Sequence, residues 1–110
     1  ATDLPLTSRQ LKRILKRTGV GIARTGGYTG HGSGEVMIGF TTANRIPSGR
    51  EEELLQISAI PEHVINRAFL AAAEAEQEAI LNSMTAAKQT RGREGELYYS
   101  LAEYLKDREA

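Results

Sequence analysis

The chain has 110 residues, enough for one domain with a modest hydrophobic core, and we expect residues 1–110 to form a single domain. Its composition is 40% hydrophobic and 25% charged, and no apolar run approaches the roughly 18 residues of a membrane span, so we expect no membrane partner. The absence of cysteine excludes disulfides, thiol catalysis and cysteine-based metal sites. It is also compatible with a reducing compartment, and we expect a cytoplasmic protein.

The net charge of zero conceals a division between the two halves of the chain. Residues 1–50 carry eight Lys or Arg and two Asp or Glu, whereas residues 51–110 carry six and twelve. Oppositely charged halves can attract each other within one fold or between subunits. The division therefore offers surfaces for oligomerisation.

The first elements expected along the chain are an extended segment and an amphipathic helix. Pro5 stops the extended segment at residues 1–6. Thr7 and Gln10 have the spacing of a capping box, and apolar residues then recur at helical spacing. This pattern predicts a helix over residues 8–24, with Gly26 as its stop.

The opposite face of this helix is basic, with Arg9, Lys12, Arg13, Lys16 and Arg17. A basic stripe is the one feature that favours nucleic acid. The neutral total, the lack of interleaved aromatic residues and the lack of a recognisable binding module oppose that interpretation. We therefore interpret the stripe as a solvated face or a subunit contact, and expect no nucleic-acid partner.

Six of the eleven glycines lie between residues 26 and 39, in or just ahead of a strand-like run that ends at residue 44. Glycines gather where the backbone needs positive φ or a close approach. Their spacing and the order of helix, loop and strand do not fit a dinucleotide-binding fingerprint, and no Lys-Ser or Lys-Thr completes a phosphate-binding loop. We therefore expect no cofactor here.

Ser33 and Glu35 are the candidate functional residues of this run. If the strand begins at Ser33, a period of two places Ser33 and Glu35 on one face and the apolar side chains Val36, Ile38 and Phe40 on the other. A hydroxyl and a carboxylate that point into one space suit a proton relay or the orientation of a nucleophile. The commoner interpretation of such spacing is a glycine-rich turn whose Ser and Glu meet solvent.

The two histidines give weaker signals. His31 lies near Ser33, where it would line the same site. His63 has no second histidine or carboxylate at ligand spacing, so we expect no metal.

The second half of the chain is mostly helical in pattern. Residues 45–58 have the composition of a long surface loop, whose apolar end at 54–57 fits a short strand or turn packed on the core. A stripe of small residues then predicts one long helix over residues 61–88, with Pro61 at its first position. After Gly92 and Gly95 we expect a short strand at 96–99 and a final helix capped by Ser100 and Glu103.

The chain resembles the DmpA-type L-aminopeptidase/D-amidase/D-esterase family, which includes the β-aminopeptidases. Several unrelated segments match in sequence order, over nearly the whole chain. These are residues 1–6, 24–28, 32–35, 39–44, 71–75, 78–82 and 92–95.

The resemblance implies a fold and a chemistry. It implies an α/β protein that forms part of a four-layer α/β/β/α sandwich, made from one precursor that cleaves itself into a long N-terminal and a short C-terminal subunit. The residue exposed by cleavage, a Ser in the family, is the N-terminal nucleophile, which attacks the amide or ester of an N-terminal amino acid to give an acyl-enzyme. The present chain resembles the short subunit.

Carried over by the resemblance, Ser33 and Glu35 match the serine and the acidic residue that support the nucleophile. Ser33 would hydrogen-bond to the nucleophile's hydroxyl, and Glu35 would hold Ser33 and help to move the proton. Gly32 and Gly34 would keep the loop backbone close to the substrate. The family's nucleophile precedes the segment that begins at Ala1 by a short apolar strand, so we expect this chain to be inactive alone.

The partners implied are the long subunit of the same precursor and a short peptide or an amino-acid amide or ester as substrate, in a homo-oligomer of heterodimers. Two alternatives belong to other classes. One is a non-catalytic scaffold subunit derived from such an enzyme, and the other is an acyltransferase of the ornithine-acetyltransferase-like fold, in which the nucleophile is typically Thr. The residue upstream of the apolar strand discriminates among the three.

Overall fold

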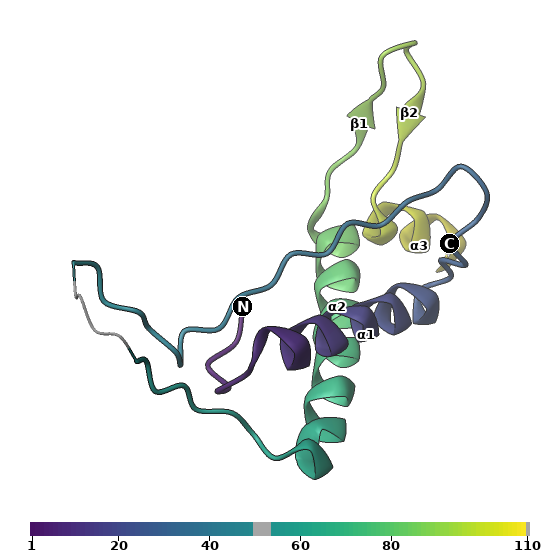
Figure 1. Ribbon diagram of the computed structural model, residues 1–110. Coiled ribbons are helices and arrows are strands. Elements are labelled where there is room, and N and C mark those ends of the chain that lie inside the picture. Colours follow the sequence, from purple (N-terminus) through teal and green to yellow (C-terminus); the bar gives the residue numbers. More distant parts are fainter. Residues whose placement is uncertain (50–53, 110) are drawn as a thin grey trace.

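The computed structural model describes residues 1–49 and 54–109 (Figure 1). Two long helices cross near the middle of the molecule, a small hairpin projects beyond the end of the second helix, and long extended segments run past both. The elements in chain order are α1 (Ser8–Arg24), the 3-10 helix η1 (Glu62–Val64), α2 (Ile65–Ala86), β1 (Thr90–Arg91), β2 (Leu97–Tyr98) and α3 (Leu101–Glu109).

The first helix begins and ends where the sequence predicts. The Thr7 hydroxyl accepts the Gln10 backbone N–H at 3.2 Å, and the Gln10 side chain accepts the Thr7 N–H at 3.1 Å, which completes the capping box. At the other end Gly26 has a φ of 102°, a conformation that favours glycine after a helix. The predicted boundaries of α1 are confirmed.

The long helix is shorter than its pattern predicts. Pro61 is extended and stands ahead of η1, so it is not the first helical residue. The α-helical hydrogen bonds begin only at Ile65, and Ala87 is again extended, with a ψ of 157°. Helix α2 therefore occupies the middle of the predicted range of 61–88.

Close packing of α1 on α2 centres on Gly21. A Cβ atom at Gly21 would lie 2.6 Å from the Ala73 carbonyl oxygen and 2.7 Å from the Cβ of Glu76, so the two backbones approach more closely than any side chain permits. Ala73 itself is only 3% exposed. The small residues of α2 therefore allow α1 to pack closely against it, as their composition predicts.

The basic face of α1 is solvated at Arg9, Lys12 and Lys16, as expected, but its half-buried Arg13 and Arg17 pack on α2. The guanidinium groups of Arg13 and Arg17 lie 5.2 Å and 3.9 Å from the centre of the Phe69 ring. Arg9 and Arg13 form ion pairs with Glu62 of η1. These contacts hold oppositely charged halves of the chain together.

The strand expected from residue 33 to residue 44 is not present as a regular strand. The segment is extended, but its pairing within the described residues is one parallel bridge between Thr2 and Thr41. There the Thr2 N–H donates to the Phe40 carbonyl at 3.1 Å, and the Thr42 N–H donates to the Thr2 carbonyl at 3.0 Å. A strand needs a neighbour along its length, and residues 33–39 have none in the described part of the chain.

The C-terminal elements follow the sequence closely. Strand β2 lies inside the predicted range of 96–99 and pairs antiparallel with β1. The Glu103 N–H donates to the Ser100 hydroxyl at 3.1 Å, and the Ser100 N–H donates to the Glu103 carboxylate at 2.9 Å, which confirms the predicted cap of α3.

The apolar end of the loop at 45–58 does not pack on a core. Leu54 is 87% exposed and Ile57 is 60% exposed, and residues 54–57 form neither a strand nor a turn. No other segment in the described residues covers them. Residues 50–53, part of the same predicted surface loop, lie outside the described residues.

The chain leaves much apolar surface uncovered. Its radius of gyration is 19.3 Å, against the roughly 13 Å of a compact domain of this length. Val36 and Ile38 of the extended segment are 90% and 87% exposed. Exposed apolar rows of this kind mark surfaces that contact another segment or chain. Within the described residues, no helix is long and apolar enough to cross a membrane.

We predict that Gly21→Ala destabilises the protein by about 1–3 kcal/mol, because the new methyl group overpacks the contact between α1 and α2. Gly19→Ala is the matched control, since its Cβ would meet only the Met37 methyl group at an ordinary 3.7 Å. Urea unfolding of the full-length protein measures both changes. Equal midpoints for the two variants would contradict the packing argument.

A second prediction concerns pH. Desolvation raises the pKa of the Glu62 carboxyl, but the hydrogen bond from Gln10 and the charges of Arg9 and Arg13 lower it by more, so it lies below its ordinary 4.5. A lowered pKa contributes stability above the unfolded value that is lost as the pH falls through the folded value. We expect wild type to melt at a higher temperature than Glu62→Gln. This difference should be largest at neutral pH and should shrink below about pH 4.5. A difference that is unchanged by acid would contradict this.

Candidate functional site

The glycine-rich segment after α1 folds into a tight turn. The Ser33 N–H donates to the Gly30 carbonyl at 3.0 Å, which closes a four-residue turn over residues 30–33. Gly32, at the third position of this turn, has a φ of 85°. That position of a type II turn requires positive φ and favours glycine. The turn therefore explains why Gly32 precedes Ser33.

Ser33 and Glu35 lie in contact directly after the turn. The Ser33 hydroxyl donates to the Glu35 carboxylate, with 3.0 Å between Oγ and Oε1. Alternation along the extended chain brings residues two apart to one side, as the sequence analysis expects. Both residues are exposed in this chain. The arrangement supplies a hydroxyl whose proton is directed at a carboxylate, with the hydroxyl oxygen free to accept a second hydrogen bond.

The remaining predicted site residues share the same loop. His31 and Gly32 form the middle of the turn, and Gly34 lies between Ser33 and Glu35. In the described residues no hydrogen bond joins His31 to Ser33 or Glu35, so the structure brings these three together only as neighbours in the loop. Across the same residues, no three His, Asp or Glu side chains gather as metal ligands would.

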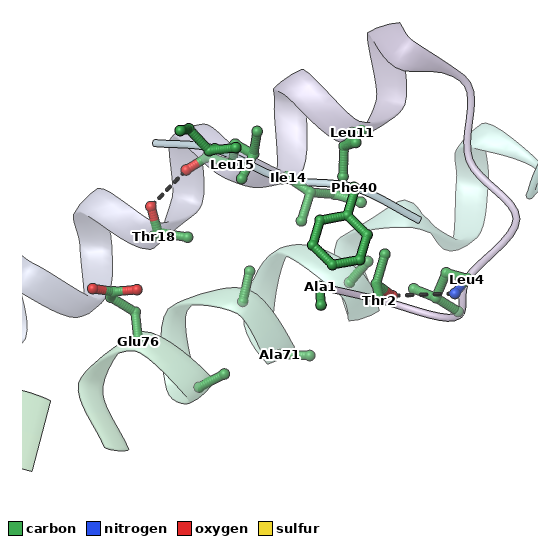
Figure 2. A pocket seen from close by; sticks show the side chains of 15 residues that line it. Ala1, Thr2, Leu4, Leu11, Ile14, Leu15, Thr18, Phe40, Ala71 and Glu76 are labelled. Atoms are coloured by element: carbon green, nitrogen blue, oxygen red, sulfur yellow. Dashed lines mark hydrogen bonds between the residues drawn. The ribbon is translucent and has the colours of Figure 1, made fainter. Parts of the chain in front are cut away.

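The extended segment after Glu35 lies over the two helices and leaves an apolar cavity of about 380 Å³ beneath it (Figure 2). The cavity lies between α1, α2, the N-terminal residues and residues 38–40. Most of its wall is aliphatic, with Leu11 and Ile14 from α1 and the alanines of α2, and Phe40 reaches in from the extended segment. The spacing of apolar residues gave no direct sign of this hollow, because each lining residue also fits an ordinary core position.

Glu35 borders a second hollow of about 320 Å³, next to the first. The two cavities share Leu15, Thr18, Ile38 and Glu76 in their walls. The two hollows therefore adjoin along α1, and the second borders one of the two candidate functional residues. Pockets that bind small molecules are commonly apolar with a few polar groups.

Asn44 was not singled out by sequence reasoning, yet it joins three segments. Its side-chain amide donates to the Leu6 carbonyl at 3.3 Å and to the Ser58 carbonyl at 2.9 Å, and its oxygen accepts the Ser58 N–H at 3.0 Å. These bonds fasten both ends of the loop that follows Asn44 to the start of α1. Its place at the end of the strand-like run was the available signal.

Comparison with known proteins gives a consistent result. The model of Peptidase family S58 matches residues 1–98. Beta-peptidyl aminopeptidase BapA of Sphingosinicella microcystinivorans is 35% identical over 86% of the chain, and that of Sphingosinicella xenopeptidilytica is 31% identical over 92%. The chain spans about a quarter of the length of these curated relatives.

Solved structures show the same fold. A Pyrococcus horikoshii protein has a TM-score of 0.85 at 47% identity, over 96% of this chain and 30% of that one. The L-aminopeptidase D-Ala-esterase/amidase of Ochrobactrum anthropi, described as a variant of the Ntn hydrolase fold, has a TM-score of 0.83 at 34% identity, over 96% of this chain and 30% of that one. The fold class implied by the resemblance, α/β and part of a DmpA-type Ntn hydrolase, is confirmed.

Proposed function

The chain belongs to peptidase family S58, and we propose that it forms the short-subunit portion of a self-processing N-terminal-nucleophile enzyme. The enzyme releases N-terminal amino acids from peptides, amides or esters through an acyl-enzyme. The single observation that carries this proposal is the hydrogen bond from the Ser33 hydroxyl to the Glu35 carboxylate, placed directly after a tight turn.

In the proposed mechanism Ser33 and Glu35 support a nucleophile that lies outside residues 1–110. The nucleophile's hydroxyl attacks the carbonyl carbon of the substrate, and the leaving amine or alcohol takes up a proton. Ser33 accepts a hydrogen bond from the nucleophile, while Glu35 fixes the orientation of the Ser33 hydroxyl and helps to move the proton that the nucleophile gives up to the leaving group. Water then hydrolyses the acyl-enzyme by the same relay.

The pairing of Thr2 with Thr41 supports a location for the nucleophile. Thr41 lies 39 positions after Thr2 in the sequence. In a parallel pair this offset stays the same along both strands, so each residue of the first strand lies beside the residue 39 positions later. If a preceding strand kept this register, the residues about five to seven positions before Ala1 would lie beside residues 33–35, which supports the proposed role of Ser33. A nucleophile at one of these positions would be a neighbour of Ser33 across the strand pair.

The remaining parts of the proposal concern partners. A long subunit of the same precursor would cover the exposed apolar side chains of residues 36–40 and complete the sheet beside them. The curated relatives are about four times as long as this chain, which leaves room for such a subunit. The assembled heterodimers would form a homo-oligomer, with Gly32, Gly34 and His31 lining the substrate side of the loop.

We expect Ser33→Ala in the full-length enzyme to lower kcat by about 10²–10⁴-fold, because the relay loses its hydroxyl. Glu35→Gln keeps the shape but not the charge, and its kcat is expected to fall within the same range. Steady-state hydrolysis of an amino-acid amide measures both variants. Ser48→Ala, at an exposed serine on the loop after residue 44, is the control. Full activity in Ser33→Ala would refute the proposed role.

The mature protein is expected to contain two chains. The shorter one should begin with Ser or Thr about five to seven positions before Ala1, as intact mass and N-terminal sequencing would show. Replacing that residue with Ala should leave an uncleaved precursor with no hydrolytic activity. A residue with neither a hydroxyl nor a thiol at that place in the natural protein would instead favour a scaffold.

A further inference from the structure

We propose that Tyr28 is a positioning residue for Ser33, acting through Gly30. This inference rests on the proposed function of Ser33 and adds a residue to its machinery. Tyr28 belongs to the Arg-Thr-Gly-Gly-Tyr segment that precedes the turn, and the proton relay itself does not use it.

The ring of Tyr28 lies over Gly30. A Cβ atom at Gly30 would lie 3.0 Å from Cε2 of the Tyr28 ring, and 3.4 Å from both its Cζ and its phenolic oxygen. The ring therefore occupies the space that a side chain at Gly30 would take. A methyl group at Gly30 would push the ring from its present position by a few tenths of an ångström.

The backbone between the two residues is held in an uncommon conformation. Thr29 has a φ of 53°, and it is the one non-glycine residue with positive φ in the described part of the chain. β-branched residues rarely adopt this conformation, and such outliers persist where their surroundings hold them. The backbone turns at Thr29, which brings the Tyr28 ring next to Gly30.

Gly30 links the Tyr28 ring to Ser33 through a backbone hydrogen bond. Its carbonyl accepts the Ser33 N–H at 3.0 Å, and Ser33 in turn donates from its hydroxyl to Glu35. Fixing the Gly30 peptide thus fixes the turn that presents the Ser33 hydroxyl. Tyr28 is 88% exposed, so its ring contributes little to a core in this chain.

The test uses the processed full-length enzyme, with processing measured by intact mass and kcat counted per processed enzyme. Tyr28→Leu removes the aromatic edge, and kcat should fall about tenfold while KM stays within about twofold, because small misplacements of a catalytic group act on the transition state. Tyr28→Phe keeps the ring edge and should retain kcat within about twofold. A loss in Tyr28→Phe as large as in Tyr28→Leu would overturn the inference.

Gly30→Ala tests the same contact from the other side. Its methyl group displaces the ring, so kcat should again fall about tenfold, and Gly30→Ala combined with Tyr28→Leu should be no worse than either change alone. Gly19→Ala, in α1, is the control for the same substitution outside the loop. Fully additive losses in the double variant would overturn the inference.

The outcome separates this inference from the proposed function. If Ser33→Ala loses activity while Tyr28→Leu and Gly30→Ala keep the wild-type kcat, the positioning role of Tyr28 is wrong and the role of Ser33 stands. If Ser33→Ala keeps full activity, the proposed function itself is wrong, and the inference that depends on it is overturned with it.

Discussion

The contact between the backbones of α1 and α2 at Gly21 sets the geometry of everything around it. Because the carbonyl oxygen of Ala73 lies only 2.6 Å from the position that a Cβ at Gly21 would take, α1 approaches α2 more closely here than a side chain would permit. This crossing fixes the end of α1, and the glycine-rich turn begins only a few residues later. The position of Ser33 relative to the helical layer therefore depends on a site that carries no functional group.

Charge supplements this packing at the other end of α1. Glu62 accepts from Arg9, Gln10 and Arg13, so the start of the second half of the chain is fixed to the start of the first helix. The cluster is exposed, and ion pairs in such positions usually contribute little to stability. Its greater effect is on orientation, because it determines where α2 begins along α1.

Local signals predicted the helices and caps well. The capping boxes at Thr7 and Ser100 depend on residues three apart, and the boundaries of α1 follow from that local chemistry. The strand after Ser33 was predicted from the same kind of pattern and is not formed, because a strand depends on neighbours that residues 33–39 do not have in the described chain. Alternation still predicted the contact between Ser33 and Glu35, since it requires only an extended backbone.

Features that depend on distant segments could not be predicted in the same way. The three hydrogen bonds of Asn44 to Leu6 and Ser58 arise from the folded path of the chain and have no characteristic spacing. The position of the Tyr28 ring over Gly30 is local, but no residue type in the segment signals the positive φ of Thr29 that accompanies it. At residues 54–57, the apolar end of the loop, the sequence instead predicted packing that the structure does not show. Its composition suggests a core, but nothing in the described residues covers it.

The bridge between Thr2 and Thr41 makes the first part of the chain a crossover unit, in which α1 connects two extended segments that run in the same direction. Such units are almost always right-handed, so α1 can cover only one face of the sheet that the two segments begin. Val36 and Ile38 remain almost fully exposed in the described part of the chain. Parallel pairing also closes a long loop before it gains any contact, which makes it a late and slow step of folding. A precursor that cuts itself beside this pairing would therefore have to finish folding first.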